Sequence, residues 1–321
     1  MHRFSIVVPL LGARQWFDDT LASVLRYRPA SSQIILVHDG TYDNPYGLED
    51  EVEFVKTTKG AGLIEHFNHG RQSATGELTA FVRPGIQFDE GWDKSLETVF
   101  ENQQVASVTP IIVTPAHPNR VVAAGVKLGS GFRRQIVGRG KKVNSRAIDQ
   151  VSPLGPISWA AFYRSSILEQ IGGFDESLDS HYLDADIALS LKTIGYQSVC
   201  CHACVLKVDE PSLITDELVL PHGKSSQRSN LRHVASLKSK PSIAQSLLVI
   251  AKEIAASPFA SWRLKHAAQR LGAWRKAKVD RDVAEQLSTL AKERERLEAI
   301  GLRVHDSSNE VELDSAGRRA A

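Results

Sequence analysis

The first hundred or so residues alternate between short apolar runs and longer segments whose apolar positions have helical spacing. The short runs predict buried strands at residues 3–10, 32–40, 51–57 and 77–83. The longer segments predict helices at residues 18–27, 62–76 and 89–101. Strands that alternate with helices are typical of an α/β domain, so we expect a mainly parallel sheet flanked by helices.

Two of these helices carry boundary signals. Asp18 or Asp19 stands where a side chain would cap the first helix, and Gly76 stands where a glycine would close the second. Three of the strands end in Pro9-Leu10, in His38-Asp39-Gly40 and in Arg83-Pro84-Gly85. Ligands of parallel sheets bind at the carboxyl ends of the strands, so these ends are the candidate site.

The middle of the chain has a different pattern. Two apolar runs at residues 105–113 and 121–128 precede a glycine-rich stretch, residues 129–146, which has Lys and Arg but no acid. This stretch is either a loop over the site or a solvated hairpin, and an exposed loop is the favoured interpretation. A helical segment at residues 181–196 and an apolar strand at residues 197–208 follow.

The character of the chain changes after about residue 222. We predict an α/β domain at residues 1–222, a helical extension at 223–304 and a disordered polar tail at 305–321. Trp262 and Trp274 lie among Lys and Arg residues in the extension. They either pack on the first domain, which we favour, or lie on an anionic membrane surface, so a peripheral membrane or protein contact stays open.

Composition narrows the class of protein. The chain has 321 residues, of which 42% are hydrophobic and 24% charged, as expected of a globular protein. The net charge of +2 gives no support for a nucleic-acid partner. No apolar run has the 18 or so residues that a membrane span needs, and the apolar start fits a first buried strand better than a signal peptide.

Three cysteines stand close together at Cys200, Cys201 and Cys204. They offer no disulfide framework, which favours a reducing compartment and a cytoplasmic location. Side chains alternate along a strand, so Cys200, His202 and Cys204 would share one face and Cys201 the other. Buried strand cysteines are favoured over a zinc site, which needs four ligands at looser spacing.

The order of several motifs resembles the family 2 glycosyltransferases, which have the GT-A fold. The matching stretches are SIVVPL, IILVHDGTYDN, GLIEHFNHGRQSATGELTAFV, AAFYRSSILEQIGGFDESL and LDADIALSLKTIGY. They span about residues 4–208. The resemblance implies an inverting transferase that moves a sugar from a nucleotide-diphosphate donor to a hydroxyl of a glycan or another acceptor.

The resemblance also implies roles for individual residues. Pro9 and Asp39 would flank the nucleoside, while Gly62 and Asn68 fall on positions beside the nucleotide. Asp184 matches the base that deprotonates the acceptor. Asp186 matches a second common acid of the family. We count it as a donor-site candidate together with Arg83, which stands at the end of a strand.

The chain departs from the family where an Asp-x-Asp motif normally holds a divalent cation on the diphosphate. Arg83 and Gly85 replace both acids, and Leu183 replaces the Glu that usually precedes the base. We therefore expect no metal site, and Mn²⁺ or Mg²⁺ is disfavoured as a cofactor. His222 is the nearest candidate for the family's further metal-side histidine, but the alignment does not bring it there.

The lost acids leave two interpretations open. Negative charge develops on the leaving diphosphate, and an arginine can meet it in place of a metal. Arg83 would then act as the electrophile, with added charge from Arg133, Arg134, Arg139, Lys141 and Lys142. Alternatively, the chain is a catalytically inactive relative that binds nucleotide or glycan and scaffolds partners, with Asp184 serving only to cap its helix.

Overall fold

The computed structural model describes residues 3–129, 133–216 and 281–299. Its strands are β1 (Phe4–Pro9), β2 (Ser32–His38), β3 (Glu53–Lys56), β4 (Leu78–Val82), β5 (Ile86–Gln87), β6 (Val105–Thr114), β7 (His117–Ala123), β8 (Val126–Gly129), β9 (Arg133–Ile136), β10 (Ala160–Arg164) and β11 (Gln197–Val208). Its helices are α1 (Arg14–Tyr27), α2 (Leu63–Ser73), α3 (Trp92–Phe100), α4 (Arg146–Asp149), α5 (Ser165–Gln170), α6 (Leu183–Thr193), α7 (Pro211–Asp216) and α11 (Arg281–Ala299).

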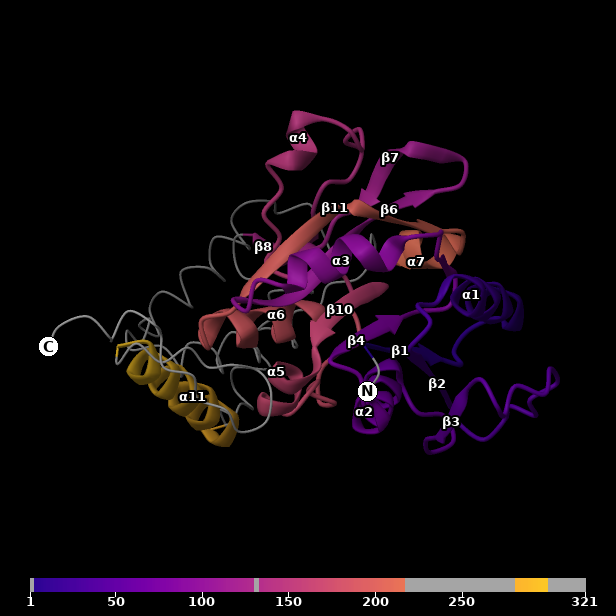
Figure 1. The fold of residues 1–321 in the computed structure, drawn as a ribbon, viewed down its shortest axis with the longest axis horizontal. Coiled ribbons are helices and arrows are strands. Elements are labelled where there is room, and N and C mark those ends of the chain that lie inside the picture. Colours follow the sequence, from indigo (N-terminus) through magenta and orange to yellow (C-terminus); the bar gives the residue numbers. More distant parts are fainter. Residues whose placement is uncertain (1–2, 130–132, 217–280, 300–321) are drawn as a thin grey trace, which may run out of the picture.

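Within the described residues, one large sheet has the order β3-β2-β1-β4-β10-β6-β11-β5, and β7 pairs with β6 (Figure 1). Strands β3, β2, β1 and β4 are parallel, as predicted. From β10 onward the sheet is mixed, because β10 runs antiparallel to both of its neighbours. Strands β8 and β9 form a separate antiparallel hairpin.

Helices cover both faces of the sheet (Figure 1). Side chains of β1 alternate between the two hydrophobic cores that these helices cover. Ile6 and Val8 pack into the core beneath α1 and α3. Val7 points the other way and packs into the core beneath α2, α5 and α6. Helix α11 adds Leu287, which is 1% exposed, to the second core. The two cores fix the strands firmly, so the loops at the strand ends carry the variable chemistry.

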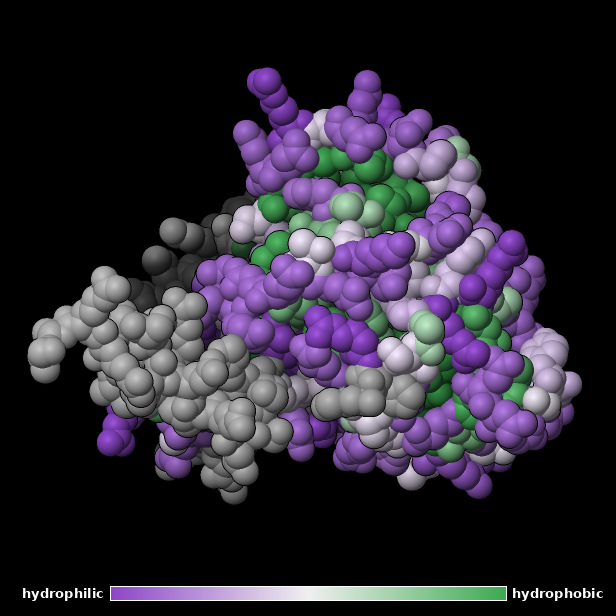
Figure 2. Space-filling view, in the orientation of Figure 1, coloured by the Kyte–Doolittle hydropathy of each residue, from purple (hydrophilic) through white to green (hydrophobic). Residues whose placement is uncertain are grey.

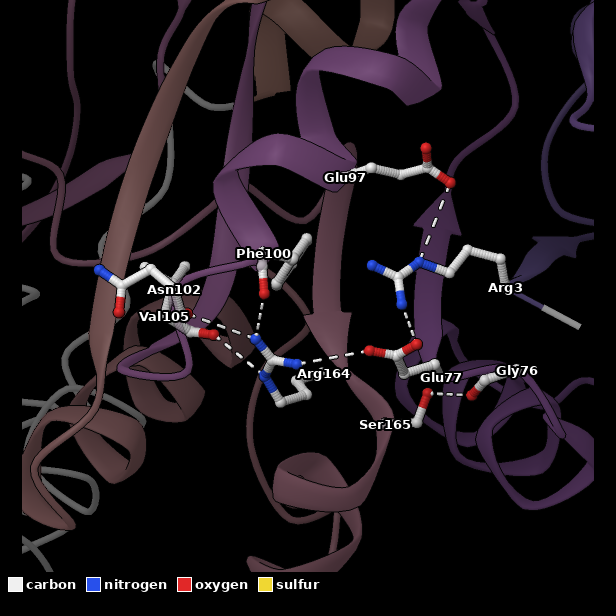
Figure 3. A network of polar contacts seen from close by, with 9 residues as sticks. All are labelled: Arg3, Gly76, Glu77, Glu97, Phe100, Asn102, Val105, Arg164 and Ser165. Atoms are coloured by element: carbon white, nitrogen blue, oxygen red, sulfur yellow. Dashed lines mark hydrogen bonds and ion pairs between the residues drawn. The ribbon is translucent and has the colours of Figure 1, made fainter. Parts of the chain in front are cut away.

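A polar network lies at the amino end of β4, opposite the candidate site (Figure 3). The guanidinium of Arg164, 1% exposed, donates to the carbonyl oxygen of Phe100 at 2.6 Å and to that of Val105 at 3.3 Å. It also lies 3.6 Å from the carboxylate of Glu77, which pairs with Arg3. This buried arginine therefore ties α3, β4 and β10 together and serves the fold.

Two predicted helix boundaries are wrong. Helix α1 begins at Arg14, and Asp18 lies inside it, where it accepts a 3.1 Å hydrogen bond from Arg14 instead of capping. Helix α2 ends at Ser73, before Gly76. A Cβ on Gly76 would lie 2.6 Å from the backbone nitrogen of Ser5, so this glycine allows close approach to β1.

The C-terminal predictions are tested only in part. Of the helical extension expected at residues 223–304, the structure describes residues 281–299, which form the charged helix α11. The basic helix with Trp262 and Trp274, the tail from residue 305 and His222 lie outside the described residues. Among the helices that are described, none combines the length and apolar character that crossing a bilayer demands.

Candidate functional site

The parallel strands bring three predicted residues to one edge of the sheet. Pro9 pairs with Val37 in the register between β1 and β2, and Asp39 follows β2 directly. Arg83 follows β4, which pairs with β1 on its other side. Pro9, Asp39 and Arg83 therefore stand at the carboxyl ends of neighbouring strands, where α/β sheets bind ligands.

Asp39 organises the loop at this edge. Its Oδ1 accepts hydrogen bonds from the backbone N–H and the hydroxyl of Thr41, and its Oδ2 accepts one from the N–H of Gly60 at 3.3 Å. The Thr41 hydroxyl, followed by the Gly60 N–H, lowers the pKa of this carboxyl because both stabilise its charged form. Asp39 is thus an ionised acceptor that joins the β2 and β3 loops.

His38 is the last residue of β2 and directly precedes Asp39. Partial burial, and then the nearby charge of Lys56, lower the pKa of the imidazole. Its Nδ1 accepts the N–H of Gly40 at 3.3 Å, which puts the proton of the neutral ring on Nε2. His38 is therefore a neutral side chain at the strand end.

Gly62 and Asn68, both expected beside the nucleotide, have different surroundings in the structure. Gly62 precedes α2, and a Cβ there would meet no atom within 4 Å, so the space beside it is open. Asn68 is buried and donates to the carbonyl oxygen of Phe174 at 2.9 Å, while its own oxygen accepts the N–H of Phe174 at 3.0 Å. It also donates to Glu176 at 2.8 Å. These contacts give Asn68 a structural role that fixes the loop after α5.

The segment Arg83-Pro84-Gly85-Ile86 forms a tight turn. The N–H of Ile86 donates to the carbonyl oxygen of Arg83 at 3.2 Å, and Gly85 has a φ of +92°. Proline followed by a residue with positive φ is the signature of a type II turn, which explains the sequence Pro-Gly. The turn aims the chain away from β4 and starts β5.

Glu210, which the sequence did not single out, packs against this turn. A Cβ on Gly85 would lie 2.4 Å from Cβ of Glu210 and 3.1 Å from its Oε2. The N–H of Asp209 donates to the carbonyl oxygen of Gly85 at 3.0 Å, which fixes the end of β11 there. The place of the second metal-binding acid is therefore filled by a neighbouring segment.

These residues do not fit a divalent cation. Hard cations need several oxygen ligands, whereas this turn offers a guanidinium, a glycine and the single carboxylate of Glu210. Asp89, the first acid after this turn in the sequence, pairs with Lys207 at 2.8 Å. In the part of the chain that the structure describes, no group of three or more His, Cys, Asp or Glu residues could hold a metal ion.

Asp184 lies in the first turn of α6, and its side chain is 0% exposed. Its two oxygens accept hydrogen bonds from Nε and Nη2 of Arg134, both at 2.6 Å, and the N–H of Ser158 donates to Oδ2 at 3.0 Å. The residue before α6 is Tyr182, and no side chain caps the helix, so the capping interpretation of Asp184 is wrong. The carboxylate is instead half of a buried, bidentate ion pair.

The hairpin that supplies Arg134 was expected to be an exposed loop. It forms β8 and β9, with Leu128 opposite Arg134, and delivers a side chain that is 5% exposed to Asp184. A short segment then links this pair to the donor edge. Ser158 contacts Asp184 through its N–H, and the carbonyl oxygen of Trp159 accepts the N–H of Arg83 at 2.8 Å. Arg83 and Asp184 are thus held by adjacent residues.

The remaining candidates contribute less. Asp186 is 4% exposed and lies about 200° around the helix axis from Asp184, so the two carboxylates do not share a face.

A bulge between Cys201 and Val205 disturbs the alternation of β11. Cys204 therefore shares a core with Cys201 and not with Cys200, against the prediction. Burial raises the pKa of Cys200 to about 12, which makes its thiol unreactive.

Comparison with known proteins bears on the fold. No protein-family model matches the chain, and no curated protein matches it in sequence. Several solved structures are similar to the chain. The structure of GalNAc-T7 with UDP, GalNAc and Mn²⁺ aligns with a TM-score of 0.56 at 12% identity, and the alignment covers 88% of this chain and 57% of the GalNAc-T7 chain. TarS from S. aureus, residues 1–349, has a TM-score of 0.54 at 13% identity, covering 98% and 97%. The complex of TarS with UDP-GlcNAc has a TM-score of 0.53.

The chain has the GT-A fold of nucleotide-sugar glycosyltransferases. The predicted fold class is therefore confirmed, while membership of family 2 stays a prediction at these low identities. Within the GT-A frame, the sequence missed Glu210 and the pairing of Arg134 with Asp184. Neither has a local signal, because both contacts join segments far apart in the chain.

Proposed function

We propose that the protein is a metal-independent glycosyltransferase that uses a nucleotide-diphosphate sugar. The observation that carries the proposal is the convergence of Arg83 and Asp184 on the Ser158-Trp159 segment within a GT-A fold. Neighbours with this fold are described with UDP and UDP-GlcNAc, which supports a nucleotide-sugar donor. Asp39, at the end of β2, would hold the nucleoside with Pro9 beside it.

Arg83 would take the part that a metal ion plays elsewhere. Its planar guanidinium keeps its charge near neutral pH and matches two phosphate oxygens at once. A fixed positive group beside the departing diphosphate stabilises the charge that develops there in the transition state. The tight Pro84-Gly85 turn holds the backbone of Arg83 at the strand end, which limits the reorganisation that this requires.

The transfer itself would be a single displacement with inversion. The hydroxyl of the acceptor gives its proton to the carboxylate of Asp184, and its oxygen bonds to the anomeric carbon. The bond from that carbon to the diphosphate breaks, and the nucleoside diphosphate leaves with the electron pair. In the structure both oxygens of Asp184 are held by Arg134 and are shielded from solvent, so Arg134 would move aside for this step.

The test is the release of nucleoside diphosphate from a panel of nucleotide-sugars with mixed glycan acceptors. Wild-type protein should turn over one donor in the presence of EDTA. Asp184→Asn should lose about 10²–10⁴-fold in turnover, the usual worth of a general base, while its donor affinity changes little. Melting curves check that the variant is folded. Unchanged turnover in a folded variant would remove Asp184 from the mechanism, and donor binding without turnover would favour the inactive, scaffolding alternative.

A further inference from the structure

The ion pair between Arg134 and Asp184 bears on the kind of acceptor. Both side chains are almost completely buried, at 5% and 0% exposure. Two hydrogen bonds of 2.6 Å join the guanidinium to the carboxylate, and the N–H of Ser158 adds a third to Oδ2. Each carboxylate oxygen therefore already has a close charged donor.

A general base must lie about 2.6–3.2 Å from the hydroxyl that it deprotonates. The carboxylate of Asp184 is 0% exposed and both of its oxygens are paired with Arg134, so we take Arg134 to be the group that moves aside when a hydroxyl approaches. Withdrawal without replacement strands a buried charge, which makes the open arrangement rarer by a factor on the order of 10²–10³. A neutral acceptor supplies nothing to offset this cost. An acceptor that brings its own anion would give Arg134 a new partner.

The segment of the chain that carries Arg134 is rich in cations. Between Glu101 and Asp149 the chain has no acidic residue, and its cations are Arg120, Lys127, Arg133, Arg134, Arg139, Lys141, Lys142 and Arg146. Among the described side chains, Arg120 and Lys141 donate to backbone carbonyl oxygens, at 3.2 and 2.7 Å, and not to acids. Figure 2 shows hydrophilic side chains projecting at the upper end of the molecule, where Figure 1 places α4 and β7, two other elements of this segment. The segment thus carries positive charge that no acid of its own balances.

We propose that the acceptor carries a carboxylate or a phosphate, and that this anion takes Arg134 from Asp184 as the acceptor binds. A guanidinium binds either group with the same two-pronged geometry that it uses for Asp184. The released carboxylate then accepts the proton of the acceptor hydroxyl. Without an anionic acceptor the base stays held, so water attacks the donor only slowly.

This inference rests on the proposed function, so donor binding is measured first by thermal shift with nucleotide-sugars. If no nucleotide-sugar raises the melting temperature, the proposed function fails, and the acceptor experiment is not needed. When a donor binds, its turnover is compared with three matched acceptors: glucose, glucuronate and glucose 6-phosphate. Wild-type protein should prefer at least one of the two anions over glucose by a factor on the order of 10² in kcat/KM. The two anionic arms distinguish carboxylate from phosphate.

Two variants separate this role from a purely structural one. Arg134→Gln should reduce the preference for the anion to a few-fold, raise KM for the anionic acceptor and increase hydrolysis of the donor by water. Arg134→Lys keeps the charge but lacks the fork, so it should fold even if the glutamine variant does not, and should keep only part of the preference. Arg146→Gln removes the same charge from an exposed position of the segment and serves as the matched control.

The proposal is overturned by equal turnover of neutral and anionic acceptors. It is also overturned if glucose is the only acceptor that supports turnover of a bound donor. Failure of all three acceptors to support turnover of a bound donor would overturn it as well. An unchanged preference in folded Arg134→Gln and Arg134→Lys would show that the pair is only a structural link between β9 and α6.

Discussion

Replacement of Gly85 tests whether the Arg83-Pro84-Gly85 turn excludes a metal-binding side chain. An L-residue with a φ near +92° costs about 1–2 kcal/mol of folding free energy. A Cβ 2.4 Å from Cβ of Glu210 must also displace the end of β11, and such overpacking costs about 1–3 kcal/mol more. Gly85→Ala should therefore lower the free energy of unfolding by about 2–5 kcal/mol.

Gly172→Ala is the matched control. Gly172 has a φ of +81°, but a Cβ there would meet no atom within 4 Å. This variant should lose only the conformational part, about 1–2 kcal/mol. Urea denaturation of both variants measures the difference, which reports the contact with Glu210. If Gly85→Ala were as stable as Gly172→Ala, the turn would have room for a side chain, and Gly85→Asp could rebuild a metal ligand.

Three further predictions concern the scaffold and its dependence on pH. Arg164→Met should lower the free energy of unfolding by about 1–3 kcal/mol, because buried carbonyl oxygens such as that of Phe100 lose their donor. Arg120→Met, at an exposed position, is the control and should change the free energy of unfolding by less than about 0.5 kcal/mol. Asn68→Asp should lower the free energy of unfolding by about 1–3 kcal/mol, since an ionised carboxylate cannot donate to Phe174 and faces Glu176. Nucleotide affinity should hold if the role of Asn68 is structural, and a loss of affinity without a loss of stability would instead support its predicted place in the donor site. The lowered pKa of His38 means that the unfolded chain binds its proton more readily, so His38 contributes stability above about pH 6.5 that is lost as the pH falls through its folded pKa. Stability curves from pH 7 to 5 should accordingly fall less steeply for His38→Asn, which keeps an acceptor for Gly40, and parallel curves would contradict this assignment.

The strands were predictable because alternation and apolar runs reflect burial directly. β1, β2 and β4 lie where the pattern put them, and their carboxyl ends meet as parallel strands require. The start of α1 was missed because Ala13, its N-cap, carries no polar side chain to mark it. The face assignment of the cysteines failed because a bulge in β11 is a tertiary feature that simple alternation does not foresee.

The sequence offered candidate residues for the site but not their contacts. The chemistry of Arg83 and Asp184 could be named from the motif order, but their partners could not. Arg134 is 50 residues from Asp184, and Arg133 beside it was an equal candidate until the register of β8 and β9 was known. The approach of Glu210 to Gly85 likewise depends on where β11 ends, which the spacing of its apolar residues leaves open.

We propose that Arg83 takes the place of a metal ion at the donor site. Calorimetric titration of a panel of nucleoside diphosphates into wild-type protein with EDTA tests it most directly, with Arg83→Gln as the variant and the exposed Arg26→Gln as the control. We expect one nucleotide to bind in EDTA, and we expect Arg83→Gln to weaken its binding about tenfold or more, as for the loss of a charge-assisted hydrogen bond, while Arg26→Gln leaves it unchanged. Binding that requires Mn²⁺ or Mg²⁺, or binding that is indifferent to Arg83, would show that Arg83 does not replace the metal.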